Sequence, residues 1–413
     1  MSIKSSDLLN IQVFRMKRVM KRFKTASLLS VIFLVSSYMC IAQDKILPAD
    51  YRVDTYLPLL KGKRVALIIN QCSKIGNKLL VDTLLKRKIN VVKIFAAEHG
   101  FRGTGEAGAN VKDTKDKKTG LPVISLYGDN KKPKPEQLTD VDVVVYDLQD
   151  VGVRFYTYIA TMQYAMEACA ENGKQFIVLD RPDPNGFYVD GPVLDTALRS
   201  FVGMQPVPIV YGMTCGEYAK MLVGEKWFND ADKLDLKVIN CVNYDHSKKY
   251  VPPVWPSPNL NSMASIYAYP TVCLFEGTVL SVGRGTATPF LVFGHPDLFG
   301  KCIFYFTPVK TPGNSNPLYE NRTCYGFVVG ANEEQVLGLL ENRVRTFYLA
   351  NVYHMFPHKD KLFNNYFDKL AGNTALKQQI IKGLSEGEIA KSWEKDLSAF
   401  KKIRKKYLLY KDF

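Results

Sequence analysis

The chain has 413 residues and a formal net charge of +15, an excess that favours polyanionic surroundings such as acidic cell-wall polymers. Nucleic acid is a weaker partner class, because no nucleic-acid-binding motif occurs and the start of the chain predicts export. About 370 residues remain after the predicted leader, and this length suits two domains.

The first 42 residues predict a cleavable signal peptide. Residues 15–24 hold six basic side chains and no acid, and residues 26–35 form an apolar run of ten that is too short to span a bilayer. Cys40-Ile41-Ala42 before Gln43 resembles a small-x-small cleavage site. We expect the mature chain to begin near Gln43, to lack a stable membrane span and to work in the periplasm or outside the cell. Loss of seven Lys/Arg and one Asp lowers its charge to +9.

Seven cysteines follow the predicted leader, an odd number at wide spacing. They are Cys72, Cys169, Cys215, Cys241, Cys273, Cys302 and Cys324. No Cys-x-x-Cys or zinc-type spacing occurs among them. Most lie in apolar stretches, so we expect buried thiols rather than a disulfide framework or a metal site.

From residue 63 onward, short apolar strands alternate with helices. The expected strands are residues 64–69, 91–95, 122–126, 141–146 and 175–179, and the expected helices are residues 77–88 and 157–172. This alternation predicts an α/β fold with a doubly wound, mostly parallel sheet. It predicts no cofactor, because Asn70-Gln71-Cys72-Ser73 follows the first strand where a dinucleotide site would have Gly-x-Gly-x-x-Gly.

The strand at residues 91–95 is followed by Glu98, His99 and a glycine-rich loop. In an open α/β sheet such a loop lies at the carboxyl edge of the strands, where ligands bind. Glycines at positions 100, 103, 105 and 108 let the backbone turn sharply and approach a ligand closely. We predict that Glu98 is the chemical centre; the alternative is a solvated turn with an incidental glutamate.

Carboxylates also follow the expected strands at residues 141–146 and 175–179. Asp147 and Asp150 come after one of them, and Asp180 comes after the other. Parallel strands bring such groups to one edge of the sheet, where like charges raise the pKa of one carboxyl and keep it protonated as a general acid. The alternative is a set of structural ion pairs, Asp147 with Arg154 and Asp180 with Arg181.

Arginines and a tyrosine near these acids are candidates for contacts with a substrate. Arg102, Arg154 and Arg181 moderate the repulsion between the acids and offer a clamp for an anionic group. Tyr156 is a candidate for stacking on a sugar ring, although a tyrosine at the start of a helix more often packs.

The next motifs are structural. Thr214 and Glu217 fit a capping box, as N-cap and N3, better than a nucleophile site, and no Gly-x-Ser-x-Gly motif supports acyl transfer. Four prolines in residues 251–259 predict a stiff, extended boundary. We therefore expect a catalytic domain at residues 43–262 and a C-terminal domain at residues 263–413.

The second domain opens with a glycine-punctuated loop that can close over the crevice of the first. This loop offers Glu276, Ser281, Arg284 and Thr286 as polar groups. Further strands are expected at residues 302–306 and 325–329, and helices at residues 333–348, 374–382 and 388–405.

Taken together, seven ordered motifs resemble those of the NamZ-type peptidoglycan exo-β-N-acetylmuramidases. They are residues 98–103, 147–158, 180–186, 190–192, 255–259, 275–278 and 283–286. The resemblance covers about residues 60–410 and implies a Rossmann-like first domain, a smaller C-terminal domain and a cleft between them. It implies removal of N-acetylmuramic acid from the non-reducing ends of cell-wall glycan fragments, with Glu98 as the catalytic glutamate. Asp183 and Val279 depart from the family pattern, which has Asn at the first position and commonly at the second.

Glycoside hydrolysis usually needs one carboxyl to protonate the leaving oxygen and a second group to act as base or nucleophile. Glu98 is the expected acid, and Asp147, Asp150 and Glu276 are candidates for the second role. An arginine at 102, 154 or 284 suits the lactyl carboxylate of muramic acid. The other expected substrate-binding residues are His99, Gln149, Tyr156, Asp180, Arg181, Asn185, Glu276, Ser281 and Thr286.

Two further functions stay open. Glu98, Asp147, Asp150 and Asp180 are hard oxygen ligands that suit Mg²⁺ in a metal-dependent phosphoesterase. A non-catalytic periplasmic protein, with two lobes closing on a cell-wall fragment, is the other alternative. It would bind the fragment without turnover.

Overall fold

The computed structural model describes residues 45–98, 101 and 114–413, so the predicted leader, His99 and Arg102 lie outside the described residues. Residues 46–413 form one compact unit. Within the described residues, no helix is long and apolar enough to cross a membrane.

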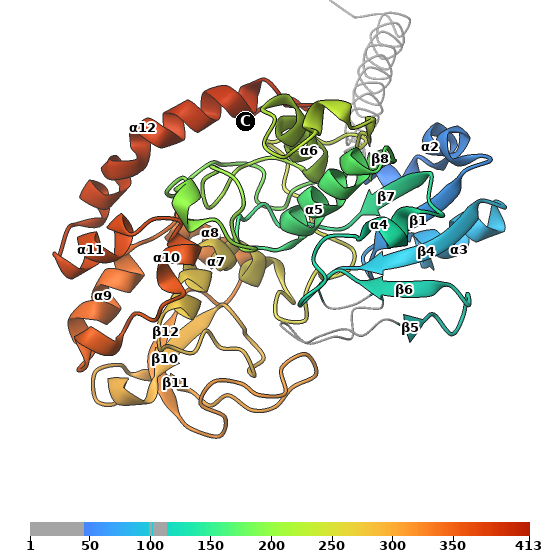
Figure 1. The fold of residues 1–413 in the computed structure, drawn as a ribbon. Helices are drawn as coiled ribbons and strands as arrows, with labels where there is room; N and C mark the ends of the chain where they lie inside the picture. Colours follow the sequence, from blue (N-terminus) through green and yellow to red (C-terminus); the bar gives the residue numbers. More distant parts are fainter. Residues whose placement is uncertain (1–44, 99–100, 102–113) are drawn as a thin grey trace, which may run out of the picture. The chain divides into compact units, whose positions relative to one another are not determined.

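Within the described residues, a seven-stranded sheet occupies the first half of the chain, in the order β5-β6-β4-β1-β7-β8-β9 (Figure 1). Its strands are β1 (Arg64–Ile69), β4 (Asn90–Ala96), β5 (Thr114–Lys115), β6 (Pro122–Ser125), β7 (Val143–Asp147), β8 (Gln175–Leu179) and β9 (Leu236–Ile239). The short β5 pairs antiparallel with β6, and the other neighbours pair parallel. The predicted mostly parallel α/β sheet is confirmed.

Strand β1 shows why this sheet is covered on both faces. Ala66 and Ile68 pack into one hydrophobic core, whereas Val65, Leu67 and Ile69 pack into another. Because successive strand residues point to opposite faces, the two cores lie on the two sides of the sheet. Helices α2 (Val53–Leu60) and α3 (Leu80–Lys86) contribute to the second core, and α5 (Tyr158–Glu171) and α6 (Cys215–Gly224) contribute to the first.

Two local details refine the predicted helices. A hairpin of β2 (Lys74–Ile75) and β3 (Lys78–Leu79) precedes α3, so this helix is shorter than predicted. The predicted capping box of α6 is confirmed, because the Glu217 amide donates to Thr214 Oγ1 at 3.3 Å and the Thr214 amide donates to Glu217 Oε2 at 2.9 Å. A short helix, α4 (Pro135–Leu138), lies between β6 and β7.

The second half combines helices with a small sheet, in the order β10-β12-β11 among the described strands. Its elements are α7 (Met263–Val272), a 3₁₀ turn (Cys273–Gly277), β10 (Val292–His295), β11 (Phe304–Phe306), β12 (Cys324–Val328), α8 (Glu333–Leu340), α9 (Phe347–Met355), α10 (Phe367–Ala371), α11 (Ala375–Ile381) and α12 (Glu386–Lys405). The predicted single helix at residues 333–348 is wrong, because Glu341 and Asn342 adopt left-handed φ values of 52° and 56° and end α8.

The two halves share one hydrophobic core. The ring of Phe155 packs edge-on against Tyr269 at 5.3 Å between centroids, and Tyr269 packs against Phe290 at 4.8 Å. The proline-rich segment at residues 251–259 crosses between the halves without regular structure. The division into domains at residues 43–262 and 263–413 stays a prediction.

Candidate active site

Glu98 lies two residues beyond the end of β4, at the carboxyl edge predicted for it. Its side chain is only partly buried. Thr157 Oγ1, next to the start of α5, donates a hydrogen bond to Glu98 Oε2 at 2.7 Å. The Tyr158 hydroxyl contacts the Glu98 carbonyl oxygen at 3.5 Å. The start of α5 therefore holds both the backbone and the carboxylate of Glu98.

Tyr127, in the loop after β6, gives the Glu98 carboxylate a second hydroxyl partner. Burial, the negative charge of Glu98 and a hydrogen bond to Glu98 raise the pKa of Tyr127 above its usual value. Its hydroxyl therefore stays protonated at neutral pH. Because a hydroxyl can donate to a carboxylate or accept from a carboxylic acid, Tyr127 and Thr157 can orient Glu98 in either protonation state.

The second half of the chain contributes an ion pair close to this carboxylate. Arg284 Nε donates to Glu276 Oε1 at 2.7 Å, and the two side chains are 26% and 24% exposed. The Arg284 guanidinium also lies 5.1 Å from the centroid of the Phe290 ring. Glu276 attracts the guanidinium and so raises the pKa of Arg284 despite its burial.

Tyr366 connects the two sets of residues. Burial raises the pKa of its hydroxyl, and the charges of Glu276 and Glu98 raise it further. Tyr366 is 38% exposed. The charge of Arg284 likewise acts on Tyr127. The fold thus brings Glu276, Arg284 and Tyr366 from the second half to the neighbourhood of Glu98.

The loop that carries Arg284 requires glycine at two positions. Gly283 and Gly285 have left-handed φ values of 75° and 84°, and a Cβ on either would approach neighbouring atoms to within 2.6 Å. Thr286 Oγ1 donates to the Gly283 carbonyl at 2.7 Å, and Ser281 Oγ accepts from the Gly283 amide at 3.3 Å. Ser281 and Thr286 therefore hold this loop through their contacts with Gly283.

Asp147 and Arg181 form a buried charge cluster with Asp50. Arg181 Nε contacts Asp147 Oδ1 and Arg181 Nη2 contacts Asp50 Oδ2, each at 2.6 Å, with all three side chains at most 2% exposed. Burial raises the pKa of Asp147, and it raises the pKa of Asp50 to about 7. Removing one partner from such a cluster leaves a buried charge and costs roughly 3–5 kcal/mol. This arrangement is that of a structural ion cluster.

The carboxylate of Asp180 is saturated by hydrogen bonds within the fold. Its carboxylate accepts hydrogen bonds from Thr214 Oγ1, the Gly216 amide, the Arg181 amide and the Tyr410 hydroxyl at 2.6–3.0 Å. Burial raises its pKa to about 6. Asp180 thus caps the N-terminus of α6, where a negative charge is stabilised.

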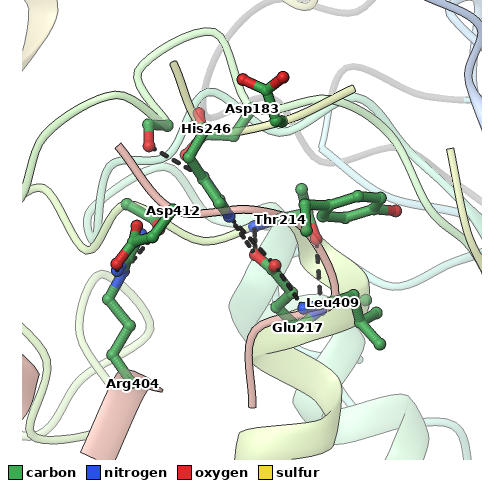
Figure 2. A network of polar contacts seen from close by, with 12 residues as sticks. Asp183, Thr214, Glu217, His246, Arg404, Leu409 and Asp412 are labelled. Atoms are coloured by element: carbon green, nitrogen blue, oxygen red, sulfur yellow. Dashed lines mark hydrogen bonds and ion pairs between the residues drawn. The ribbon is translucent and has the colours of Figure 1, made fainter. Parts of the chain in front are cut away.

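A related network fixes the C-terminal segment beside α6 (Figure 2). Glu217 accepts from the Leu409 amide at 2.8 Å and contacts His246 Nε2 at 3.0 Å. The His246 amide donates to the Lys411 carbonyl at 3.0 Å. Glu217 and His246 therefore tie the C-terminal segment to α6.

The remaining predicted polar residues are buried as well. Asp150 Oδ2 accepts from the Gly152 amide at 2.7 Å and from the Tyr211 hydroxyl, and burial raises the pKa of Asp150 to about 7. Gln149 Nε2 donates to two backbone carbonyls at 2.9 Å, and Asn185 Nδ2 donates to two at 2.8 and 3.3 Å. They hold neighbouring loops together.

Arg154, predicted as a clamp for an anion, lies inside the fold and is engaged by backbone carbonyls. Its side chain is 1% exposed, and its guanidinium donates to the carbonyls of Pro192, Val207, Leu370 and Ala371 at 2.8–2.9 Å. Burial lowers its pKa to about 9. Tyr156 is 7% exposed and donates its hydroxyl to the Pro256 carbonyl at 3.0 Å.

The acids that were candidates for holding Mg²⁺ do not form a metal site within the described residues. Among residues 45–98, 101 and 114–413, no three His, Cys, Asp or Glu side chains are grouped so that they could hold a metal ion. Asp147 and Asp180 are engaged by Arg181 and by the start of α6, respectively. The seven cysteines are free thiols, buried except for the partly exposed Cys302.

Sequence reasoning missed Tyr127, Thr157 and Tyr366. The strand-end rule that selected Glu98 applies equally to Tyr127, which follows β6, and would have found it. Thr157 lies inside the motif at residues 147–158, where nothing local distinguishes it from its neighbours. Tyr366 precedes α10, and no local pattern marks it.

Comparison with known proteins agrees with the resemblance found in the sequence. The family model "Exo-beta-N-acetylmuramidase NamZ, N-terminal" matches residues 65–264, and its C-terminal counterpart matches residues 267–410. The chain is 39% identical over 381 residues to "Peptidoglycan beta-N-acetylmuramidase NamZ" of Bacillus subtilis (strain 168), covering 87% of this chain and 90% of that relative.

Two solved structures, both of DUF1343 family proteins from Bacteroides fragilis NCTC 9343, share the fold. One is 42% identical with a TM-score of 0.83, covering 90% of this chain and 100% of the other. The second is 30% identical with a TM-score of 0.71, covering 89% of this chain and 99% of the other. The matches to both family models and the similarity along most of the chain show that it belongs to the NamZ family of exo-β-N-acetylmuramidases.

Proposed function

We propose that the protein is an exo-acting glycosidase that releases N-acetylmuramic acid from the non-reducing ends of peptidoglycan fragments. The observation that carries the proposal is the partly exposed Glu98 carboxylate, held by hydroxyls at the carboxyl edge of the sheet and approached by Arg284 from the second half. The relative from Bacillus subtilis, named a peptidoglycan β-N-acetylmuramidase, supports the same activity.

Glu98 acts as the general acid in this proposal. It gives its proton to the glycosidic oxygen as the bond to the muramic acid carbon breaks, so that the remaining sugar leaves as a neutral alcohol. The bond from Thr157 fixes the orientation of the carboxyl group while the proton moves. Positioning of this kind is worth more when the donor groups are already in place before the reaction.

Glu276 is the favoured second catalytic group. Asp147 and Asp150 are at most 5% exposed, whereas the Glu276 side chain is 24% exposed and its charge reaches Tyr366 beside Glu98. Its hydrogen bond from Arg284 Nε holds the carboxyl group in one orientation. Inversion and retention of configuration differ in the distance between the two carboxyls, and product stereochemistry separates them.

Arg284 is the favoured partner of the lactyl carboxylate. Glu276 occupies its Nε, and the two Nη groups of a guanidinium form a planar fork that matches a carboxylate. Since N-acetylglucosamine lacks the lactyl group, this contact would discriminate between the two sugars.

The test is hydrolysis of a pair of chromogenic substrates by the purified protein. We expect a nitrophenyl N-acetyl-β-muramide to be hydrolysed and the matching N-acetyl-β-glucosaminide to be left intact. Equal rates on both would contradict the specificity. Tight binding of the muramide without turnover would favour the binding protein, and loss of activity in EDTA would favour the metal-dependent enzyme.

Peptidoglycan lies outside the cytoplasmic membrane, and the basic, then apolar, start of the sequence fits delivery to that compartment. The proposal therefore includes export, with residues 1–42 removed and the mature enzyme working in the periplasm or outside the cell.

A further inference from the structure

Glu276, the favoured second catalytic group, lies on the 3₁₀ turn Cys273–Gly277. In a 3₁₀ helix the side chains of residues i and i+3 lie one above the other, so this turn places Cys273 beside Glu276. The Cys273 thiol donates a hydrogen bond to Glu276 Oε2, with 3.5 Å between sulfur and oxygen. Arg284 Nε donates to the other oxygen, Oε1, at 2.7 Å. Each oxygen of this carboxylate therefore has a donor from the protein.

The backbone of the turn is held by the segment around the start of α10. Asn364 Nδ2 donates to the Glu276 carbonyl at 3.1 Å, and the Asn364 amide donates to the Gly277 carbonyl at 3.0 Å. A Cβ on Gly277 would lie 2.5 Å from the Cα of Phe367, so α10 packs directly against the turn. The freedom left to Glu276 is rotation of its side chain, and such rotation breaks the two hydrogen bonds to its carboxylate.

The Cys273 thiol keeps its proton and has a partner of its own. The side chain is 1% exposed, and burial raises its pKa well above the usual value. It is therefore a donor toward Glu276 at neutral pH. The Tyr269 hydroxyl, one turn earlier on α7, is hydrogen-bonded to the Cys273 sulfur, and the Cys273 amide donates to the Tyr269 carbonyl. These contacts fix the sulfur from which Glu276 accepts.

Phe290 supports the donors on both sides of the carboxylate. Its ring packs edge-on against Tyr269 at 4.8 Å between centroids, and the Arg284 guanidinium lies 5.1 Å from the centroid of the same ring. Phe290 has a left-handed φ of 61°, a conformation that costs a bulky residue on the order of 1–3 kcal/mol. Backbone strain of this kind is concentrated at functional sites, where the surrounding structure enforces it.

We propose that Cys273 is a positioning residue, whose thiol holds the Glu276 carboxylate in the orientation that the reaction needs. The proposal rests on the function proposed above, in which Glu276 is the second catalytic group. Cys273 does not touch the substrate and acts through Glu276 alone. A misplacement of about 1 Å in a catalytic group can cost roughly 10²-fold in rate, so even a weak donor contributes.

A buried cysteine more often serves only as a small apolar side chain. In that role, its replacement would disturb the packing to the same extent whether or not residue 276 carries a carboxylate. In the positioning role, the effect of replacing Cys273 depends on the carboxylate of Glu276. A double-mutant cycle separates the two roles, because only coupled residues depart from additivity.

The experiment measures kcat and KM on the nitrophenyl muramide and on the disaccharide of N-acetylmuramic acid linked to N-acetylglucosamine. Cys273→Ala removes the donor, Cys273→Val removes it while filling the space, and Cys273→Ser keeps a donor. The two donor-free changes are also made in the Glu276→Gln background. Cys324→Ala, which removes a fully buried thiol from β12, is the matched control. Thermal unfolding shows which variants are folded.

We expect both donor-free variants to lower kcat about 3–5-fold, the effect of one weak hydrogen bond, with KM nearly unchanged. Cys273→Ser should recover most of this loss, and the control should keep the wild-type kcat. In the Glu276→Gln background, replacing Cys273 should lower kcat no further.

Wild-type kcat in the donor-free variants overturns the proposal, and so does an equal fold loss in both backgrounds, which is the result for a thiol that only packs. Wild-type kcat in Glu276→Gln overturns the proposal together with the assigned role of Glu276. An inactive wild type differs from all of these results, because it overturns the proposed function itself and the inference with it.

Discussion

The Thr157 hydroxyl donates to Glu98 Oε2 across 2.7 Å, joining the start of α5 to the loop that follows β4. The two residues are 59 positions apart in the chain. Because both lie at the carboxyl edge of the parallel sheet, the bond needs no unusual backbone conformation. It fixes the orientation of the carboxyl group that the proposed mechanism uses as an acid.

Replacing Thr157 by Val removes this hydroxyl and keeps the branched shape. A net hydrogen bond is worth about 1 kcal/mol, so we expect kcat/KM on the disaccharide to fall roughly 5–10-fold. Thr157→Ser retains the hydroxyl and should recover most of the loss. The measurement is steady-state kinetics with thermal unfolding of each variant. A Thr157→Val enzyme with wild-type kinetics would remove the positioning role.

Replacing Arg154 should mainly lower stability, whereas replacing Arg284 should mainly lower activity. Arg154→Met leaves four buried carbonyls without their donor, so the free energy of unfolding should drop by at least about 3 kcal/mol. Arg284→Met should change stability little, because the pair that it breaks is one-quarter exposed, but it should lower kcat/KM on the muramide. Denaturant unfolding and kinetics of both variants check this; an inactive but fully stable Arg154→Met would contradict it.

Asp150 should make the protein less stable as pH rises. Burial raises its pKa to about 7, above the unfolded value of 3.8, so the folded state holds a proton that the unfolded state releases. Its contribution is fully present below about pH 4 and is lost as pH rises through about 7. Asp150→Asn keeps the hydrogen bonds to Oδ2 and removes this titration. We expect its Tm to fall less between pH 4 and 7 than that of the wild type; parallel curves would rule out Asp150 as the source.

The predicted leader is tested on protein expressed from the full gene in a bacterium that exports it. We expect N-terminal sequencing of the exported protein to begin near Gln43. Exported protein that still starts at Met1 or Met20 would contradict cleavage. A variant in which the six basic residues of positions 15–24 are replaced by neutral ones should accumulate with its leader uncleaved, since the basic region directs insertion.

The sheet and Glu98 could be read from the sequence because both depend on local patterns. Continuous apolar runs such as Val143 to Tyr146 mark strands buried on two faces, and the rule that ligands bind at the carboxyl ends then selects Glu98. The break between α8 and α9 could not be read, since the left-handed residues Glu341 and Asn342 are not marked by a glycine.

The other strand-end residues make their contacts with partners far away in the chain. Arg181 pairs with the carboxylate of Asp50, 131 residues earlier. Arg154 donates to the carbonyl of Leu370, 216 residues later. No spacing rule reveals such contacts. Tyr366 could not be predicted for the same reason, since it lies near the site only because the second half folds against the first. A strand-end rule finds the edge of the sheet, but tertiary packing decides which side chains there remain open to a ligand.

Glu98→Gln tests the central claim most directly, with Glu334→Gln on the exposed first turn of α8 as the matched control. Glutamine keeps the size of glutamate and an oxygen for Thr157, so the variant should unfold at the wild-type temperature. We expect kcat/KM on the disaccharide to fall roughly 10²–10⁴-fold, the usual range for loss of a general acid. An activated nitrophenyl muramide needs less protonation and should lose less. Wild-type activity of Glu98→Gln on the disaccharide would contradict the assignment of Glu98 to the reaction, and equal losses on both substrates would contradict its role as the acid.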